Sequence, residues 1–342
     1  MPLSSILPDR FILALLLALG LASFLPARGG FALAVDSLST AAVVLLFFLH
    51  GVRLPREAVI AGIVHWRLHL VILFCTFLLF PMLGLVASRI APDLLPGPLW
   101  IGVLFLCALP STVQSSIAFT SIARGNVPAA IAAATASNLA GMVLTPALVS
   151  LLVHAQGAEI SVSGVWKIMS QLLAPFLIGH LVRPWLGEWA RNNKTLLAFT
   201  DRGTIVLAVY SAFSAAVLAG LWHTISLGTL LTLAGLCAVL LLGVLVATAL
   251  GSRKLGFSKA DEIAIVFCGS KKSLVSGVPM AKILFTGTAM GGVVVPLLVF
   301  HQMQLIVCAW LARRYAAGEH DVTAWDAARP YSTSNDRETG HV

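Results

Sequence analysis

The chain alternates between long apolar stretches and short polar clusters. A helix needs about 20 predominantly apolar residues to cross the roughly 30 Å of hydrocarbon in a bilayer. With the polar clusters as boundaries, ten stretches approach this length, and the pattern predicts an all-α polytopic membrane protein with ten transmembrane helices. The stretches lie near Phe11–Leu25, Leu33–Leu49, Leu68–Val86, Leu99–Ile122, Val127–Val153, Val165–Val182, Gly203–Leu221, Leu227–Leu250, Ile263–Phe285 and Gly292–Leu311.

The first stretch has two interpretations. Arg10 precedes an apolar run that ends near Leu25 and Pro26, which is typical of a secretory signal with a basic flank. However, further apolar stretches follow directly, and no segment resembles a mature soluble chain. We therefore interpret it as the first transmembrane helix.

Composition excludes a water-soluble globular protein. Of the 342 residues, 58% are apolar and only 11% are charged, whereas a soluble domain carries about 25% charged residues. The mean hydropathy of +0.95 leaves too little polar surface for a chain surrounded by water. The five cysteines fall inside apolar stretches without disulfide or metal-ligand spacing, so we expect helix packing and no bound metal or resident cofactor.

The basic residues indicate an orientation. With a cytoplasmic N-terminus, only four of the 22 Lys and Arg residues fall outside, two lie within a span, and sixteen face the cytoplasm. The four outside are Arg28, Arg89, Lys167 and Lys282, and the two within a span are Lys271 and Lys272. This asymmetry predicts that both termini are cytoplasmic, and it explains the net charge of +8 without a nucleic-acid partner.

Ten spans divide into two sets of five. Because each set has an odd number of spans, the second set runs through the membrane upside down relative to the first, as in many secondary transporters. The predicted first inverted repeat covers residues 1–156, and the second covers residues 157–315. Residues 316–342 are polar and without apolar periodicity, and they are predicted to be a disordered cytoplasmic tail.

The fourth and ninth predicted helices are each interrupted by polar residues near mid-span. In the fourth, Pro110 breaks the helix and a largely polar run from Ser111 to Ser116 follows. In the ninth, Cys268–Ser273 brings glycine and charge together. A break of this kind in a single membrane helix often serves packing alone. Two polar breaks in matching positions of the two halves instead indicate a binding site at the bilayer midplane.

Lys271 and Lys272 are the strongest chemical signal in the predicted spans. A lysine near the bilayer centre costs about 2.5 to 3.5 kcal/mol on insertion scales, so two lysines need water or partners. The acids nearest to membrane depth are Asp36 and Asp201, and neither lies in the spans with the breaks. We infer that an exchangeable anion is the missing partner, helped by carbonyls freed at Gly269. The alternative is that the pair lies at the interface and extends into water.

Other polar candidates lie beside the breaks and in neighbouring spans. The groups after Pro110 either satisfy the opened backbone or bind a solute, and those of the fifth span either face the same cavity or join helices. His301 interrupts the tenth span, and a buried neutral histidine is the alternative to a binding role there. The candidate substrate- and ion-binding residues are Ser111, Thr112, Gln114, Ser115, Ser116, Thr135, Ser137, Asn138, Ser270, Lys271, Lys272, Ser273, His301 and Gln302.

Signatures of soluble enzymes and of ATP-driven pumps are absent from the sequence. It contains no phosphate-binding loop, dinucleotide glycine fingerprint, His-Glu-x-x-His run or nucleophile elbow. An intramembrane enzyme would need a nucleophile and a base, and no such pair is visible. We therefore predict that the chain is not an enzyme, and that any driving force comes from a sodium or proton gradient or from the gradient of the substrate.

At these residues the sequence resembles the bile acid:sodium symporter family (solute carrier family 10), in the branch close to its member 7 and the bacterial relatives. The resemblance covers roughly residues 10–315, and its most specific pieces are Leu109–Ser116, Ala123–Asn126 and Phe267–Leu274. It implies two inverted five-helix repeats arranged as a panel domain and a core domain, with the broken fourth and ninth helices crossing in the core. Such a crossing would bring Ser115 and Ser116 close to the two lysines.

The sequence departs from the pattern of the sodium-coupled members of that family. Their Glu-x-Gly-x-Gln-Asn run at the second break is replaced here by Phe267, Lys271 and Lys272 at the Glu, Gln and Asn positions, and their fifth-helix hydroxyls by Ala130 and Ala134. A sodium ion beside two ammonium groups and without a carboxylate is electrostatically unfavoured. The departure suggests that a tethered lysine charge occupies the sodium position, and that one lysine could exchange a proton.

Together these features predict a secondary transporter of a small organic anion in the bacterial cytoplasmic (inner) membrane. The alternative is a regulatory or ion-homeostasis protein of the same fold that senses or scaffolds without transport.

Overall fold

The computed structural model describes residues 10–53, 65–154, 162–220, 225–285 and 289–327. These residues form helices and contain no β-strand, which confirms the predicted all-α class. The helices are α1 (Arg10–Phe24), α2 (Gly29–Arg53), α4 (Trp66–Phe74), the π-helix η2 (Cys75–Leu79), α5 (Phe80–Ile90), the 3-10 helix η3 (Pro92–Leu94), α6 (Gly97–Ala108), α7 (Val113–Ile122), α8 (Val127–His154), α9 (Val162–Asn192), α10 (Lys194–Leu218), α12 (Leu227–Lys254), α13 (Lys259–Gly269), α14 (Leu274–Leu284) and α15 (Ala289–Ala327).

Each of the ten predicted apolar stretches falls on a helix or on consecutive helices of the described chain. Among the described residues, seven helical segments are long and apolar enough to cross a membrane, and the pair α6 and α7, bent by 60°, makes an eighth if it is one span. The two remaining stretches fall on α1, whose apolar part is short, and on α9, which carries several polar residues.

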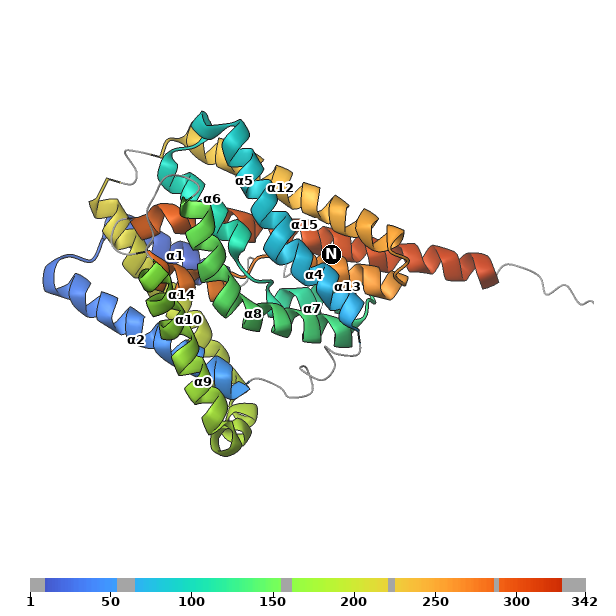
Figure 1. Cartoon of the computed structure of the whole chain (residues 1–342), viewed down its shortest axis with the longest axis horizontal. Coiled ribbons are helices and arrows are strands. Elements are labelled where there is room, and N and C mark those ends of the chain that lie inside the picture. Colours follow the sequence, from blue (N-terminus) through green and yellow to red (C-terminus); the bar gives the residue numbers. More distant parts are fainter. Residues whose placement is uncertain (1–9, 54–64, 155–161, 221–224, 286–288, 328–342) are drawn as a thin grey trace, which may run out of the picture.

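The helices pack in two groups (Figure 1). The first group, called the panel group here, contains α1, α2, α9 and α10. The second, the core group, contains α4 to α8 and α12 to α15, with η2 and η3. Helices α8, α14 and α15 of the core group also contact the panel group, so the interface between the groups runs past the second broken helix.

Close packing of two glycines holds α2 against α9 in the panel group. A Cβ atom at Gly51 would lie 2.0 Å from the carbonyl oxygen of Phe176, and one at Gly179 would lie 2.0 Å from that of Phe48. The two helices therefore touch through their backbones, as small residues permit in membrane proteins.

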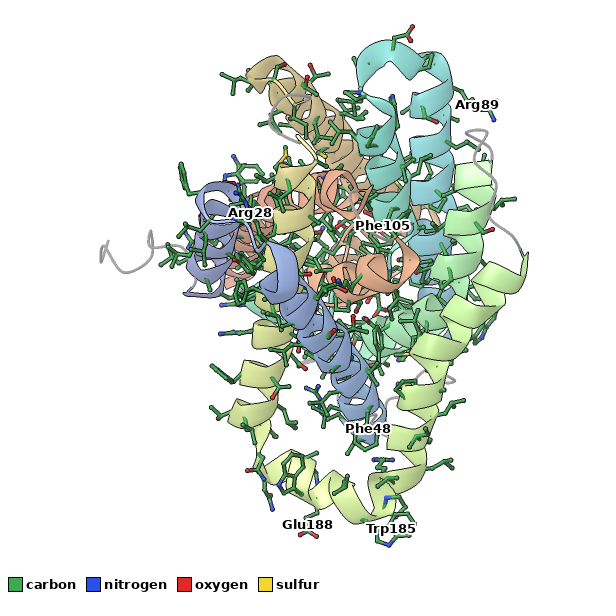
Figure 2. The ribbon with its side chains drawn as sticks, turned by 90° about the vertical axis from the view of Figure 1, so that its left-hand side faces the viewer. Arg28, Phe48, Arg89, Phe105, Trp185 and Glu188 are labelled. Carbon is green, nitrogen blue, oxygen red and sulfur yellow. The ribbon has the colours of Figure 1, made fainter. Side chains whose placement is uncertain are left out.

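Residues near the two ends of α2 show which parts of the molecule lie far apart. Arg28 lies at the start of α2 and Phe48 near its end, while the hairpin between α9 and α10, with Trp185 and Glu188, lies at the far end below Phe48 (Figure 2). Arg89 lies at the opposite end from that hairpin (Figure 2). Arg28 and Arg89, both predicted to lie outside, are thus remote from the α9–α10 hairpin with its several basic residues.

Helix α15 differs in length from its prediction. It continues to Ala327, so it extends into residues 316–342, which the sequence predicts to be disordered. A backbone that keeps bonding along the helix axis needs no apolar periodicity. Residues 328–342, and the predicted repeat boundary at 156–157, lie outside the described residues.

Candidate functional site

The two helix breaks lie against each other in the core group. Helix α6 ends at Ala108 and α7 begins at Val113, and α13 ends at Gly269 while α14 begins at Leu274. The Ser273 amide donates to the Pro110 carbonyl at 2.9 Å. Because the peptide groups in both breaks are free of helical bonding, they are able to bond to each other across the crossing.

Three hydroxyls of the first break secure this crossing. Ser111 donates to the Cys268 carbonyl at 2.6 Å, Ser116 to the Phe267 carbonyl at 3.0 Å and Thr112 to the Lys272 carbonyl at 2.8 Å. The last carbonyls of a helix have no partner inside it. Ser111 and Ser116 satisfy two of them at the end of α13, and Thr112 bonds a carbonyl of the break itself. Ser111 and Ser116 therefore serve the backbone, which was one of the two readings of these residues.

Lys272 is held by the backbone of other helices. Its ammonium donates to the carbonyls of Thr76, Cys107 and Leu109, each at 2.8 Å, and lies 4.2 Å from the centre of the Phe80 ring. The side chain is fully buried. An ammonium has three donors, and all three are used. Lys272 is thus a fixed cation at the end of α6, where the helix dipole favours positive charge.

Two prolines make acceptors available for this ammonium. In the π-helix η2, each amide bonds to the carbonyl five residues earlier, as the Phe80 amide does to the Cys75 carbonyl. The next such bond would join residue 81 to the Thr76 carbonyl, but Pro81 has no N–H. Similarly, Pro110 has no N–H for Cys107, and the amide of Ser111 bonds to the Ser137 hydroxyl at 3.0 Å instead. Carbonyls left without helical donors therefore meet the charge of Lys272.

A buried glutamine fixes the main chain of Lys272. The Gln304 amide oxygen accepts from the Lys272 N–H at 2.9 Å, and its nitrogen donates to the Lys272 carbonyl at 2.8 Å. The same nitrogen lies 2.9 Å from Nδ1 of His301. His301 thus contacts Gln304, a residue missing from the sequence candidates.

The side chain of Lys271 lies in a different environment from that of Lys272. Its ammonium lies 3.7 Å from the centre of the Phe119 ring and 5.8 Å from that of Phe267. The side chain is fully buried, and its nitrogen has no hydrogen-bond partner in the described part of the chain. The two adjacent lysines therefore differ: Lys272 is fully bonded, and Lys271 is held by aromatic faces alone.

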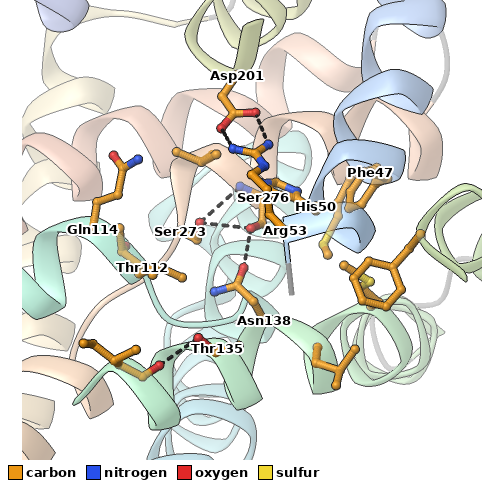
Figure 3. A pocket seen from close by; sticks show the side chains of 17 residues that line it. Phe47, His50, Arg53, Thr112, Gln114, Thr135, Asn138, Asp201, Ser273 and Ser276 are labelled. Atoms are coloured by element: carbon orange, nitrogen blue, oxygen red, sulfur yellow. Dashed lines mark hydrogen bonds and ion pairs between the residues drawn. The ribbon is translucent and has the colours of Figure 1, made fainter. Parts of the chain in front are cut away.

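A cavity of about 330 Å³ lies between the panel group and the core group. Figure 3 shows its polar centre, in which Asn138 of α8 meets Ser276 of α14. The Ser276 hydroxyl donates to the Asn138 oxygen at 2.6 Å, and the Asn138 nitrogen donates to the Ser111 carbonyl at 2.7 Å. Apolar side chains form much of the remaining wall, namely Phe47, Val113, Ile131, Leu139, Met142, Phe176, Val275 and Met280.

The first turns of both helices that follow the breaks reach this cavity. Thr112 and Gln114 line it from the start of α7, and Ser273 and Ser276 from the start of α14. Ser273 caps α14 by accepting from the Ser276 amide at 3.1 Å, whereas Thr112 forms no side-chain cap on α7. The positive ends of two helix dipoles thus face one cavity, an arrangement that favours an anion.

The panel side of the cavity carries an ion pair. Arg53 and Asp201 bond through two contacts of 2.8 Å, seen as paired dashed lines in Figure 3, and His50 lies beside them. Because Asp201 neutralises Arg53, this wall adds little net charge. Neither residue nor Ser276 was among the sequence candidates, although the sequence marked Asp201 as an acid near membrane depth.

The structure thus places some of the predicted site residues at the cavity and others away from it. Those that line the cavity are Thr112, Gln114, Thr135, Asn138 and Ser273. Those that do not line it are Ser111, Ser115, Ser116, Ser137, Ser270, Lys271, Lys272, His301 and Gln302. Within the described residues, no group of three or more His, Cys, Asp or Glu side chains is placed to hold a metal ion.

Residues 9–317 match the sequence profile of the SBF-like CPA transporter family. The chain belongs to this family. It is 53% identical to a putative symporter of Escherichia coli, YfeH, over 90% of this chain and 92% of the relative. It is also 52% identical to an uncharacterised Pseudomonas aeruginosa protein over 95% of this chain and 98% of that protein.

A more distant relative is the mouse sodium/bile acid cotransporter 7, which is 27% identical over 87% of this chain and 90% of the relative. The predicted resemblance is therefore confirmed. As a member of the SBF-like CPA transporter family with several membrane-length apolar helices, the chain is an integral membrane transporter.

Proposed function

We propose that this protein is a secondary active transporter that moves a small organic anion through the cavity between the panel and core groups. The proposal rests on one observation above all: the first turns of α7 and α14 both line this cavity. Half-helix termini that point at a midplane site are the anion-binding device of many secondary transporters. The volume of about 330 Å³ suits a small ligand, and the apolar wall suits its carbon skeleton.

In this proposal the ten helical segments form two inverted repeats of five, with α6–α7 and α13–α14 as equivalent broken helices. The packing of α1, α2, α9 and α10 into one group supports it, because these are the first two predicted spans of each half. Both termini are then cytoplasmic, and the protein lies in the bacterial inner membrane. Transport proceeds by rocking of the panel group against the core group around the cavity.

The coupling ion in this proposal is not sodium. The carbonyls of Thr76, Cys107 and Leu109 are already bonded by the Lys272 ammonium, so the tethered charge stands in for an exchangeable cation. Lys271 has no hydrogen-bond partner in the described chain and is the better placed of the two to exchange a proton. The remaining options are a proton or the gradient of the substrate alone.

Flux in proteoliposomes tests the proposal. Purified protein should take up at least one anion from a set of small carboxylates and sulfonates, and replacing sodium with potassium should leave the rate unchanged. Asn138→Ala should lower uptake by at least about tenfold, the size of effect that loss of a buried hydrogen-bonded group gives. Asn193→Ala, which removes only a local contact to the Trp189 carbonyl on an exposed surface, is the matched control.

The outcomes separate the candidate functions. Anion binding without flux, for wild type and variants alike, would favour the regulatory or ion-homeostasis protein over the transporter. Uptake that requires sodium would contradict the tethered-cation interpretation while leaving transport intact.

A contact between the two groups predicts how transport can be stopped. Lys282 at the end of α14 bonds to Asp36 of α2 and lies 3.4 Å from the Ser211 hydroxyl of α10. Asp36 is half exposed, and such ion pairs are weak enough to open during a cycle. Cross-linking of the double variant Asp36→Cys and Lys282→Cys with a cleavable bifunctional thiol reagent should hold this contact and arrest uptake, and cleavage of the reagent should restore it. Normal uptake by the cross-linked protein would contradict rocking at this contact. Asp36→Cys alone is the control.

A further inference from the structure

A second cavity, of about 450 Å³, adjoins the solute cavity at Arg53, Gln114 and Asp201, which line both. It lies among α2, α7, and the hairpin of α9 and α10. Four cations line it, Arg53, Arg183, Arg191 and Lys194, against Asp201 as the acid. Asp201 is already engaged by Arg53 in the bidentate pair, so the positive charge of the other three is uncompensated.

These three cations have no carboxylate partner within the described residues. Glu188 is the nearest acid in the sequence, but it lies at the outer edge of the hairpin (Figure 2) and does not line the cavity. Basic residues at the cytoplasmic end of a membrane helix are common as orientation signals and then face water. Arg191 and Lys194 are also exposed here, but together with Arg183 they line one cavity, whose wall includes small and apolar residues such as Ala190 and Leu197.

The spacing of residues along α9 leaves room for a ligand between two arginines. Arg183, Gly187 and Arg191 follow each other at intervals of four residues, which puts them on one helix face. All three line the cavity, and Gly187 offers no side chain between the two guanidinium groups. A Cβ atom there would meet only the Arg183 side chain, at 3.2 Å. The helix thus presents two arginines with a gap between them.

We propose that this cavity binds a phosphate group between Arg183 and Arg191, with Lys194 as the third cation. Planar guanidinium groups bond phosphate oxygens in pairs, so a phosphate group, with several acceptor oxygens, matches two arginines and a lysine better than a single carboxylate does. The phosphate belongs either to a soluble phosphate ester or to the headgroup of an anionic lipid. The exposed Trp185 and Trp189 on the same hairpin place the cavity at headgroup depth, since tryptophan favours the membrane interface.

Binding measurements on the purified protein test this site without requiring transport. In nanodiscs of phosphatidylcholine alone, glycerol-1-phosphate is titrated and the melting temperature is followed. In a second arm, nanodiscs with and without phosphatidylglycerol are compared. We expect stabilisation in at least one arm. A response to glycerol-1-phosphate identifies a soluble ester as sufficient, and a response only to phosphatidylglycerol identifies the lipid.

Two variants and a control make the result specific. The double variant Arg183→Gln and Arg191→Gln should raise the Kd at least about tenfold, which corresponds to about 1.4 kcal/mol. Gly187→Leu keeps every charge but fills the gap, and it should weaken binding to a similar degree. The control, Lys254→Gln with Arg313→Gln, removes two exposed cations that do not line the cavity and should bind as wild type does.

The proposal is overturned by any of three results. The first is no stabilisation in either arm, and the second is equal binding by wild type and the arginine double variant. The third is equal weakening by the control, which would indicate nonspecific attraction to net charge. Should Gly187→Leu fail to fold, the arginine double variant decides the question. Failure of solute flux leaves these binding results unaffected.

Discussion

Replacing Lys272 with methionine is expected to destabilise the folded protein strongly. The carbonyls of Thr76, Cys107 and Leu109 would lose their shared donor while staying buried. Each buried polar group without a partner costs about 1 to 3 kcal/mol, and a folded domain has only about 5 to 15 kcal/mol of net stability. In detergent, the variant should melt about 10 °C lower than wild type or elute as an aggregate in size-exclusion chromatography.

Lys271→Met is the matched control, because it removes an equally buried lysine from the adjacent position. It costs the contact with the Phe119 and Phe267 rings, worth roughly 2 kcal/mol or less, and leaves no described hydrogen-bond acceptor unpaired. We expect it to fold and to be affected mainly in uptake. Equal stability of the two variants would contradict the assignment of Lys272 as a fixed structural cation.

Adding a methyl group at the crossing of α2 and α9 is expected to destabilise the panel group strongly. In Gly51→Ala and Gly179→Ala the new Cβ atom would stand 2.0 Å from a carbonyl oxygen of the other helix. Overpacking usually costs about 1 to 3 kcal/mol, and here the obstacle is backbone, which cannot change rotamer as a side chain does. Both variants should melt well below wild type, and the double variant no better than either.

Alanine at Gly203 and at Gly243 provides the comparison. Both glycines lie inside helices, and a Cβ atom at either position meets nothing within 4 Å. These changes should be neutral or should stabilise the helices, since alanine is favoured over glycine in a helix interior by about 1 kcal/mol. If Gly51→Ala behaved as Gly203→Ala does, the close contact of α2 and α9 would be disproved.

The sequence predicted where the helices and their breaks lie, but not what each side chain at the breaks does. Pro110 and Gly269 stop helices for local reasons, so the breaks could be located from residue type alone. Lys271 and Lys272 are adjacent, and their opposite environments depend on elements almost 200 residues away in the chain, such as η2 with Thr76. No local rule distinguishes the two.

The panel side of the cavity was the least predictable part. Arg53 looks like an ordinary basic residue at the end of a span, and its partner Asp201 lies 148 positions further on. Gln304 was missed in favour of Gln302, although its spacing of three residues from His301 puts these two side chains on one helix face. Gln114, in the first break, and Asn138, in the following span, were both candidates for a midplane site, and the structure places both at the wall of the cavity.

The environment of Lys272 also constrains how this position is able to change in evolution. Pro81 and Pro110 each withhold an N–H, and Lys272 supplies the hydrogens that are then missing. Loss of the lysine alone leaves these carbonyls without a donor. Replacement of a proline alone adds a backbone N–H that competes with the lysine for the same carbonyl. The three positions should therefore covary: homologues without this lysine should also lack one or both prolines, or should recruit a free cation to the same carbonyls.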